Sequence, residues 1–333
     1  MKKASAYSSL KVALVSDDLT RICLSYECRV INVTPRNGRL VLNYWKPDVL
    51  FVESAWGGRW NSWRYKIAAY PDHPDRSNRS LARLVEAARD RNIPTVFWNR
   101  EDGVHFDRFI GSASLFDHIL TVDENMVPRY REIVGSHVSV DVMMFAAQPA
   151  IHHPKDGTVM RRASFVGSYG RHIHPERRAW QDMIFRGAKG IGVTVYDRNS
   201  RRKADRYRFP EHSWIHIKKG VSHVRTADIY RRYIANLNVN TICDSATAFS
   251  RRLVEILACG GFAVTNSTPA VRRLFGDYCR MIDSEDEAKD LFDRLAGEGL
   301  SPDDRQRVSA GTDHVLRQHT WRHRLEQIAA VVV

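Results

Sequence analysis

The segment DSATAFSRRLVEILACGGFAV, residues 244–264, combines side chains that could hold a phosphorylated ligand. Its apolar residues have helical spacing, and two glycines follow as a helix end. A helix start offers unpaired backbone N–H groups and the positive end of a dipole, which together favour a phosphate. Arg251 and Arg252 lie near that start, and guanidinium groups match phosphate oxygens with paired hydrogen bonds. Glu255, one turn further on, could accept hydrogen bonds from a ribose.

A simpler explanation of the same residues is an Arg–Glu pair on the surface of a helix, worth a few tenths of a kcal/mol. The residues alone leave both explanations open. The polar residues that precede the apolar positions predict a helix cap at one of three side chains, namely Asp244, Ser245 or Thr247.

A second candidate is the stretch SFVGSYGR, residues 164–171, in which a short apolar strand leads into a loop with two glycines. Such a turn lets the backbone approach a diphosphate, although an ordinary turn explains the pattern equally simply. We therefore predict that Gly167, Ser168 and Arg171 contact a diphosphate together with Arg251 and Arg252.

Titratable side chains also follow two apolar runs in the first half of the chain. ESAWGGRWNSW, residues 53–63, places Glu53 beside two glycines and three tryptophans, a mixture typical of sugar and base platforms. FWNREDGVHF, residues 97–106, places Asp102 and His105 just after a buried strand. Glu53, Asp102 and His105 are therefore candidates to orient or deprotonate an acceptor. The structural alternative is a histidine that only packs.

Histidine pairs occur in HHP, HIH and HSWIH, but none has a third ligand at a spacing that suits a metal. The sequence therefore predicts no metal site. Five cysteines are scattered without a CxxC pair, which favours reduced thiols in a cytoplasmic protein. No apolar run is long enough to cross a membrane.

The formal net charge of +13 is concentrated in the second half of the 333-residue chain. Residues 161–208 contain 13 Lys or Arg against 4 Asp or Glu. Such an excess favours a polyanionic partner, namely a nucleoside diphosphate, a nucleic acid or an anionic membrane face. A solvated arginine-rich surface is the simpler alternative.

Short apolar runs alternate with amphipathic helical patterns along the whole chain. In the first half the predicted strands are KVALVS, DVLFVES, PTVFWN and DHILTVD; in the second half they include ASFVG, GVTVYD, ANLNV and FAVTN. This alternation predicts an α/β fold with parallel sheets. Residues 145–157, with two prolines and a glycine, read as a linker. We predict Rossmann-like domains at residues 1–148 and 149–312, and a terminal helix within 313–333 that packs back toward the N-terminal domain.

Several blocks, in order, resemble the CgeB-like family of spore-maturation-type glycosyltransferases. They are VALVSDDLT, KPDVLFVESAWGG, IPTVFWNREDGVHFDRFI, FVGSYGRH and SRRLVEILACGGFAV. The resemblance implies the GT-B architecture, in which two Rossmann-like domains face each other across a cleft. It also implies a nucleoside-diphosphate sugar as co-substrate, and we expect the nucleotide to be UDP. The same resemblance implies no tightly bound cofactor and no metal. Residue by residue, Glu255 would hold the donor ribose, while Arg251, Arg252 and the Gly167–Ser168 loop would hold the diphosphate.

The function expected from this resemblance is the transfer of a hexosyl or pentosyl group to an acceptor hydroxyl. The acceptor would be a glycan, a protein or a lipid-linked molecule. DNA with hydroxylated bases is an alternative, because RNSRRKADRYR, residues 198–208, interleaves arginines with a tyrosine as nucleic-acid-binding surfaces do. A non-catalytic GT-B-like module that binds nucleic acid is a further alternative.

Overall fold

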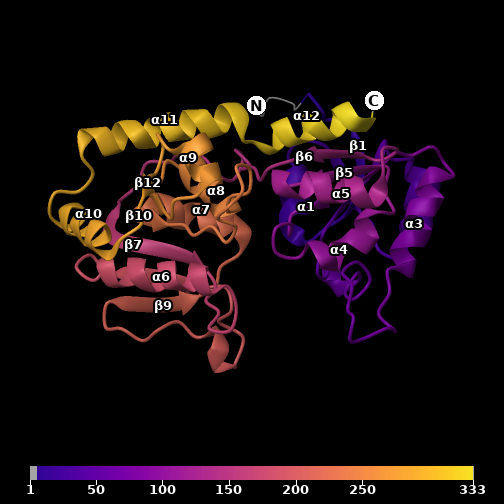
Figure 1. Cartoon of the computed structure of the whole chain (residues 1–333). Coiled ribbons are helices and arrows are strands. Elements are labelled where there is room, and N and C mark those ends of the chain that lie inside the picture. The colour runs from indigo at the N-terminus through magenta and orange to yellow at the C-terminus, as the bar shows by residue number, and fades with distance from the viewer. Residues whose placement is uncertain (1–5, 333) are drawn as a thin grey trace. The chain divides into compact units, whose positions relative to one another are not determined.

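The computed structural model describes residues 6–332, and the chain divides into two compact units (Figure 1). Unit 1 comprises the residues up to Phe145 together with those from Trp321 onward. Unit 2 comprises Ala146–Thr320. Each unit contains one six-stranded sheet in which all neighbouring strands run parallel. The α/β fold with two parallel sheets, predicted from the alternating pattern, is confirmed.

The sheet of unit 1 has the strand order β2-β1-β3-β4-β5-β6. Its strands are β1 (Lys11–Val15), β2 (Arg29–Asn32), β3 (Val49–Glu53), β4 (Thr95–Asn99), β5 (His118–Thr121) and β6 (Ser139–Val142). Its helices are α1 (Asp18–Leu24), α2 (Gly38–Leu40), α3 (Arg79–Arg89), α4 (Phe106–Ala113), α5 (Val127–Val134) and α12 (Trp321–Val332). A π-helical turn (Val41–Trp45) and two 3₁₀ turns (Arg59–Asn61, Glu124–Met126) complete the unit.

Neighbouring residues of β4 show how this sheet is covered on both faces. Phe97 packs against Phe116, with ring centroids 5.2 Å apart. Trp98 contacts Trp321, the first residue of α12, edge to face at 5.7 Å. Because successive strand side chains point to opposite faces, α12 covers the face of the sheet opposite to Phe116. The last helix of the chain is therefore part of the core of unit 1.

The sheet of unit 2 has the strand order β12-β11-β10-β7-β8-β9. Its strands are β7 (Met160–Gly167), β8 (Val193–Asp197), β9 (Ile215–Lys219), β10 (Tyr233–Leu237), β11 (Ala263–Thr265) and β12 (Arg280–Met281). Its helices are α6 (Pro175–Gly187), α7 (His223–Arg232), α8 (Arg251–Ala258), α9 (Pro269–Phe275), α10 (Glu285–Gly297) and α11 (Pro302–Gln318), with a 3₁₀ turn at Asp205–Tyr207.

The chain of unit 2 starts in the middle of its sheet. From β7 it proceeds through β8 to β9, then returns to β10 on the other side of β7 and continues outward to β12. Helix α6 packs with α10, whereas α8 packs with α7 and α11. Right-handed crossovers that progress in opposite directions place these two groups of helices on opposite faces of the sheet.

None of the helices in the described part of the chain combines the length and apolarity needed to cross a membrane.

The helix start that the sequence suggested at residues 244–247 is wrong. Helix α8 begins at Arg251, and Ser250 is its N-cap residue. The hydroxyl oxygen of Ser245 instead accepts the backbone N–H of Ala248 at 3.0 Å, so this stretch forms a local turn of its own. The later start brings Arg251 and Arg252 into the first helical turn.

Candidate functional site

The strand order of unit 2 creates a switch point between β7 and β10. These strands are neighbours in the sheet, and the chain leaves them in opposite directions. In open parallel sheets a crevice forms at this place, beyond the carboxyl ends of the two strands, and ligands bind there. Gly167 ends β7, and Asn238 directly follows β10. The residues around these two positions therefore define the candidate site.

Arg252 connects the ends of both strands. Its Nε donates a hydrogen bond to the carbonyl oxygen of Val166 at 2.6 Å, and its Nη1 donates to the side-chain oxygen of Asn238 at 3.3 Å. The guanidinium also lies over the ring of Phe165, 4.9 Å from its centroid. Burial lowers the pKa of Arg252 to about 10, so the side chain stays cationic at neutral pH. The structure thus places the Arg252 guanidinium between the ends of β7 and β10.

Two further arginines meet the loop after β7. The Nη2 of Arg198 donates to the hydroxyl oxygen of Ser168 at 3.2 Å, and the Nη2 of Arg177 lies 3.4 Å from the Ser168 carbonyl oxygen. Burial, and then the charges of Arg252 and Arg198, lower the pKa of Arg177 to about 10. We call Arg177, Arg198 and Arg252 the three-arginine cluster. The three like charges repel one another, and a bound anion would relieve that repulsion.

The environment of Gly167 shows how tightly the cluster is built. A β-carbon at this position would lie 2.8 Å from the Nη2 of Arg252 and 2.8 Å from the ring of Phe165. Glycine is therefore required for the guanidinium to approach the strand end. The buried Nε of Arg177 has no hydrogen-bond partner among the described residues. An unpaired buried donor is costly, and an anionic ligand would supply its acceptor.

Arg171 was predicted to contact the same diphosphate, but its side chain contacts a different part of unit 2. Its Nε lies 3.4 Å from the carbonyl oxygen of Arg208. It lines a surface pocket of about 470 Å³ together with six other residues, namely Tyr169, Arg178, Asp182, Arg186, Pro210 and His212. No residue of the three-arginine cluster lines this pocket. The structure therefore separates Arg171 from Arg252.

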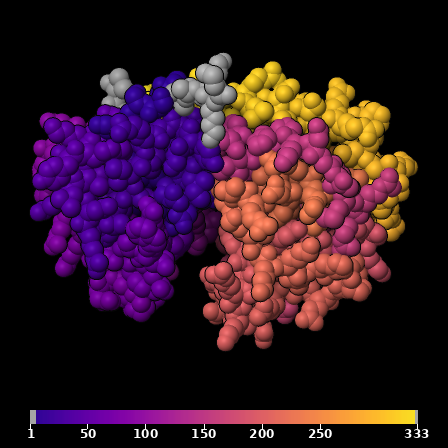
Figure 2. Space-filling view, turned by 180° about the vertical axis from the view of Figure 1, so that it is seen from behind, coloured from indigo at the N-terminus to yellow at the C-terminus, as the bar shows by residue number. Residues whose placement is uncertain are grey.

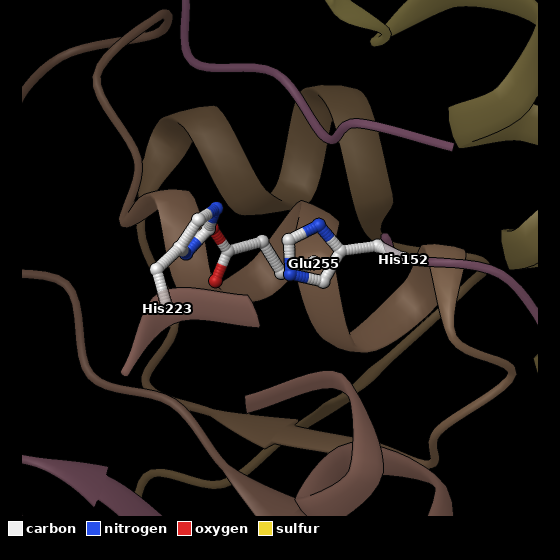
Figure 3. Close-up of side chains that lie close together, drawn as sticks. All are labelled: His152, His223 and Glu255. Atoms are coloured by element: carbon white, nitrogen blue, oxygen red, sulfur yellow. The ribbon is translucent and has the colours of Figure 1, made fainter. Parts of the chain in front are cut away.

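Arg251 and Arg252 are adjacent in sequence, yet their side chains reach different groups. The Nη1 of Arg251 donates to Glu255 Oε1 at 2.6 Å and lies 3.2 Å from His223 Nδ1. The side chain of Glu255 is 2% exposed, and the hydroxyl of Tyr230 lies 3.5 Å from its other oxygen. Glu255 therefore belongs to a buried polar group between α7 and α8 (Figure 3), with His152 beside it.

Glu53 and Asp17 lie at the corresponding switch point of unit 1, between β1 and β3. Glu53 is fully buried, and its carboxylate accepts hydrogen bonds from the Asp17 backbone N–H at 2.7 Å and from the Thr20 hydroxyl. Arg100 contacts the side chains of Asp17 at 2.7 Å and Glu53 at 3.7 Å. Burial raises the pKa of Glu53. These bonds fix the loops that follow three neighbouring strands.

Asp102 is likewise an internal residue, with 1% exposure. Its carboxyl oxygens accept hydrogen bonds from the Thr121 hydroxyl at 2.6 Å and the Tyr130 hydroxyl at 2.9 Å, and from the Asn99 side-chain amide at 2.5 Å. Burial, which outweighs these hydrogen bonds, raises the pKa of Asp102 to about 7. The structure gives this carboxyl a role in holding the loop after β4.

His105 is the partly exposed member of the three predicted acceptor-side residues. It precedes α4, and its ring contacts that of Trp56 edge to face at 5.2 Å. Burial lowers the pKa of His105, so its imidazole is neutral at neutral pH and can accept a proton. Of Glu53, Asp102 and His105, this histidine is the side chain that a ligand can reach without disrupting the core.

Sequence reasoning did not single out Arg177 and Arg198 individually. Both lie in residues 161–208, where the positive charge is concentrated, and Arg198 directly follows the predicted strand GVTVYD. The signal that could have found Arg198 is therefore a cation at the carboxyl end of a parallel strand. Arg177 carries no such signal, because its position depends on how α6 packs beside Ser168.

Comparison with known proteins agrees with this architecture. Residues 177–330 match the family described as glycosyl transferase-like. No curated protein matches the sequence. Three solved structures share the fold, each matched over 89% of this chain: a sucrose-phosphate synthase from Thermosynechococcus elongatus, the trehalose-6-phosphate synthase OtsA, and a UDP-forming α,α-trehalose-phosphate synthase from Burkholderia xenovorans.

The sucrose-phosphate synthase is 8% identical, with a TM-score of 0.53 and 76% of its chain covered. OtsA is 12% identical, with a TM-score of 0.55 and 75% of its chain covered. The Burkholderia enzyme is 11% identical, with a TM-score of 0.51 and 77% of its chain covered. At this level of identity the similarity shows the fold. Residues 177–330 are thus similar to the glycosyl transferase-like family, and the whole chain has the two-sheet α/β architecture of GT-B glycosyltransferase structures.

Proposed function

We propose that this protein is a metal-independent glycosyltransferase that moves a sugar from a nucleoside-diphosphate donor, a UDP-sugar, to an acceptor hydroxyl. The observation that carries the proposal is the three-arginine cluster around Gly167 and Ser168 at the switch point of unit 2. The family match of residues 177–330 and the fold of the sugar-phosphate synthases support it. The order of the N-terminal blocks supports the finer assignment to the CgeB-like family.

In the reaction, the bond between the anomeric carbon and the β-phosphate oxygen breaks, and the acceptor oxygen forms the new bond. The leaving diphosphate gains negative charge as the first bond breaks. Arg252, Arg198 and the Ser168 hydroxyl would bind these oxygens and stabilise the developing charge. Because the three guanidinium groups are held by backbone and side-chain oxygens before the donor arrives, little reorganisation is needed.

The roles of Arg251 and Glu255 follow from the same proposal. Glu255 would accept hydrogen bonds from the ribose, and Arg251 would bind phosphate. Since Arg251 Nη1 lies 2.6 Å from Glu255 Oε1, donor binding must first separate this pair. The Arg251 side chain is 27% exposed, so its guanidinium has room to turn toward a ligand. This rearrangement distinguishes Arg251 from Arg252, which is already in place.

In unit 1, we propose that His105 deprotonates the acceptor hydroxyl. A neutral, partly exposed imidazole can take the proton that the hydroxyl loses. Asp102 and Glu53 act as positioning residues that hold the loops after β4 and β3. The five free cysteines support a reducing, cytoplasmic location.

One observation favours a polyanionic acceptor, with DNA as the second candidate. Most side chains of residues 198–208 are exposed, and Figure 2 shows this salmon-coloured part of unit 2 at the surface. Within it the guanidinium carbons of Arg202 and Arg206 lie 4.5 and 5.3 Å from the ring centroid of Tyr207. DNA binding that weakens steeply with added salt would support this candidate, and no binding at low salt would remove it.

The test of the donor site is calorimetric binding of UDP to the full chain. Replacing Arg198 by alanine removes one charge-assisted contact, worth about 1.5–3 kcal/mol, and should weaken binding about 10- to 100-fold. Arg305→Ala is the matched control, because Arg305 is an exposed arginine of α11 in the same unit. Equal UDP affinity in the wild type and in Arg198→Ala and Arg177→Ala would refute the site.

A further inference from the structure

We propose that His152, His223 and Glu255 form a binding site for a divalent transition-metal ion of the zinc class. This His–His–Glu cluster lies within unit 2. It shares the Glu255 carboxylate with the ribose contact of the proposed function, so zinc and the donor would compete for that group. Its residues come from three separate segments: the stretch before β7, the first residue of α7 and the second turn of α8. Figure 3 shows the two imidazoles on either side of the carboxylate.

The spacing of the possible ligand atoms carries the proposal. One atom from each residue can be chosen so that all three lie within 4.8 Å of one another. Tetrahedral zinc with bonds of 2.0–2.1 Å requires ligand atoms roughly 3.3 Å apart. The side chains therefore have to close by about 1.5 Å at most, which rotation about side-chain bonds provides. Two imidazoles and one carboxylate are a set that zinc uses in open, three-ligand sites.

His152 is the second, independent observation. Its side chain is fully buried, and neither ring nitrogen has a hydrogen-bond partner among the described residues. A buried imidazole without partners costs free energy, and a metal ion would satisfy one of its nitrogens. Arg231 fixes the backbone on both sides of it, since its Nη2 donates to the Ile151 carbonyl at 2.8 Å and its Nε to the His153 carbonyl at 2.7 Å.

Arg251 shows that a cation fits beside the other two ligands. Its Nη1 lies 2.6 Å from Glu255 Oε1 and 3.2 Å from His223 Nδ1, so one positively charged group already bridges carboxylate and imidazole. A metal ion would take over both contacts, and the partly exposed guanidinium would turn out toward solvent. Arg231, the other nearby cation, stays paired with two carbonyls and with Asp228 at 3.2 Å.

This arrangement could not be predicted from the sequence, because the histidine pairs lack a third ligand at a suitable spacing. His152 belongs to the HHP stretch, and its partners lie far along the chain. The packing of α7 against α8 brings His223 and Glu255 together, and the segment before β7 adds His152. The fold thus brings together three possible ligands whose spacing in the sequence does not indicate a metal site.

The experiment titrates the chelator-treated full chain with zinc chloride in a calorimeter and measures its thermal unfolding with and without zinc. The wild type should bind a single ion and unfold at a higher temperature with zinc, as mass action requires. His152→Gln and His223→Gln should bind zinc about 100-fold or more weakly, since even outer-shell groups are worth about 10- to 100-fold. His152→Cys should retain zinc binding, because a thiolate is also a zinc ligand.

His153→Gln is the matched control, because this exposed neighbour is outside the cluster. Wild-type zinc binding that equals that of the double variant His152→Gln/His223→Gln would overturn the proposal. UDP titration of the same variants separates this result from the proposed function. His152→Gln should still bind UDP, so loss of zinc binding with UDP binding intact tests the metal site alone.

Discussion

Arg252 hydrogen-bonds through its Nε to the carbonyl oxygen of Val166, 2.6 Å away, and thereby joins helix α8 to the carboxyl end of β7. The bond spans 86 residues of sequence and crosses the switch point of the sheet. It directs the guanidinium toward the loop that begins at Gly167, where Arg177 and Arg198 meet Ser168. The proposed donor site is therefore built around a contact that also stabilises the unit.

Replacing Gly167 by alanine should disturb this contact. The added methyl group would lie 2.8 Å from Arg252 Nη2 and from the Phe165 ring, closer than β-carbons normally approach. We expect UDP affinity to fall about tenfold and the free energy of unfolding to fall by about 1–3 kcal/mol. Calorimetry and urea denaturation measure the two effects. Gly297→Ala, with open space around its β-carbon, should leave both unchanged.

Removal of Arg198 should weaken the donor site without harming the fold. Its side chain is exposed, and its charge lowers the pKa of both Arg177 and Arg252. Relief of that repulsion offsets the loss of the bond to Ser168 and of the attraction to Asp197, so thermal unfolding of Arg198→Ala should occur close to the wild-type temperature. UDP affinity should nevertheless fall. A marked drop in unfolding temperature would show that Arg198 has a structural role instead.

Asp102 should make the stability of the protein depend on pH. Its pKa of about 7 in the folded state lies above the ordinary value of 3.8, so the folded protein holds this proton more tightly than the unfolded chain. Its contribution is then fully present below about pH 4 and is lost as the pH rises through about 7. The loss amounts to roughly 1.4 kcal/mol for each pKa unit.

Asp102→Asn removes the titration and keeps the shape of the side chain. The hydroxyls of Thr121 and Tyr130 can rotate to accept from the new amide. The difference in free energy of unfolding, wild type minus variant, should therefore decrease between about pH 5 and about pH 8. Urea denaturation at several pH values measures it. A difference that is constant across this range would contradict the raised pKa.

Trp60 should contribute to acceptor binding and little to stability. Its side chain is 78% exposed, and its backbone has φ 56° and ψ 26°, a left-handed conformation that is strained for a tryptophan. Arg59 lies over its ring, 4.1 Å from the centroid. Trp60→Ala should leave unfolding unchanged and lower the rate of transfer to a sugar acceptor at subsaturating concentration. Trp63→Ala is the contrasting variant, since this neighbour is buried and its loss should destabilise unit 1.

Trp321 should be essential to the stability of unit 1, because it is 1% exposed and contacts Trp98. We expect Trp321→Ala to lower the free energy of unfolding by about 3–5 kcal/mol. Guanidinium denaturation followed by circular dichroism measures the change. Arg322→Ala, an exposed neighbour paired with Glu326, should cost less than about 1 kcal/mol. Equal stability of the two variants would show that α12 is not part of the core.

The elements with continuous apolar runs were predictable from the sequence. β3 (VLFVE) and β4 (TVFWN) are buried at every position, so their composition alone indicates internal strands. The edge strands β2 and β6 escaped prediction, because only one residue of each is buried and polar side chains interrupt the apolar pattern. Local composition identifies a strand only where both of its faces are covered.

The candidate site was predictable in part. Gly167, Ser168 and Arg252 follow local signals, namely a turn after a strand and cations near a helix start. The contacts of Arg177 and Arg198 with Ser168 depend on the direction of the crossovers between strands. The hydrophobic periodicity of the sequence does not indicate that direction. The early start predicted for α8 is wrong because the Ser245 hydroxyl accepts the Ala248 N–H within a local turn. Composition does not distinguish such a turn from a helix cap.

The chain passes between its two units twice, after Phe145 and after Thr320. The two passages adjoin, since the Ala147 N–H donates to the His319 carbonyl at 2.9 Å. Just after the second passage, the Nε of Arg324 donates a hydrogen bond to the Met144 carbonyl oxygen at 2.7 Å, which ties α12 to the end of the first segment of unit 1. During synthesis on the ribosome, unit 1 therefore stays incomplete until the last helix emerges, although most of its residues are made first. Unit 2 is one uninterrupted segment, so all of its residues are made before α12 and it can fold before unit 1 is complete.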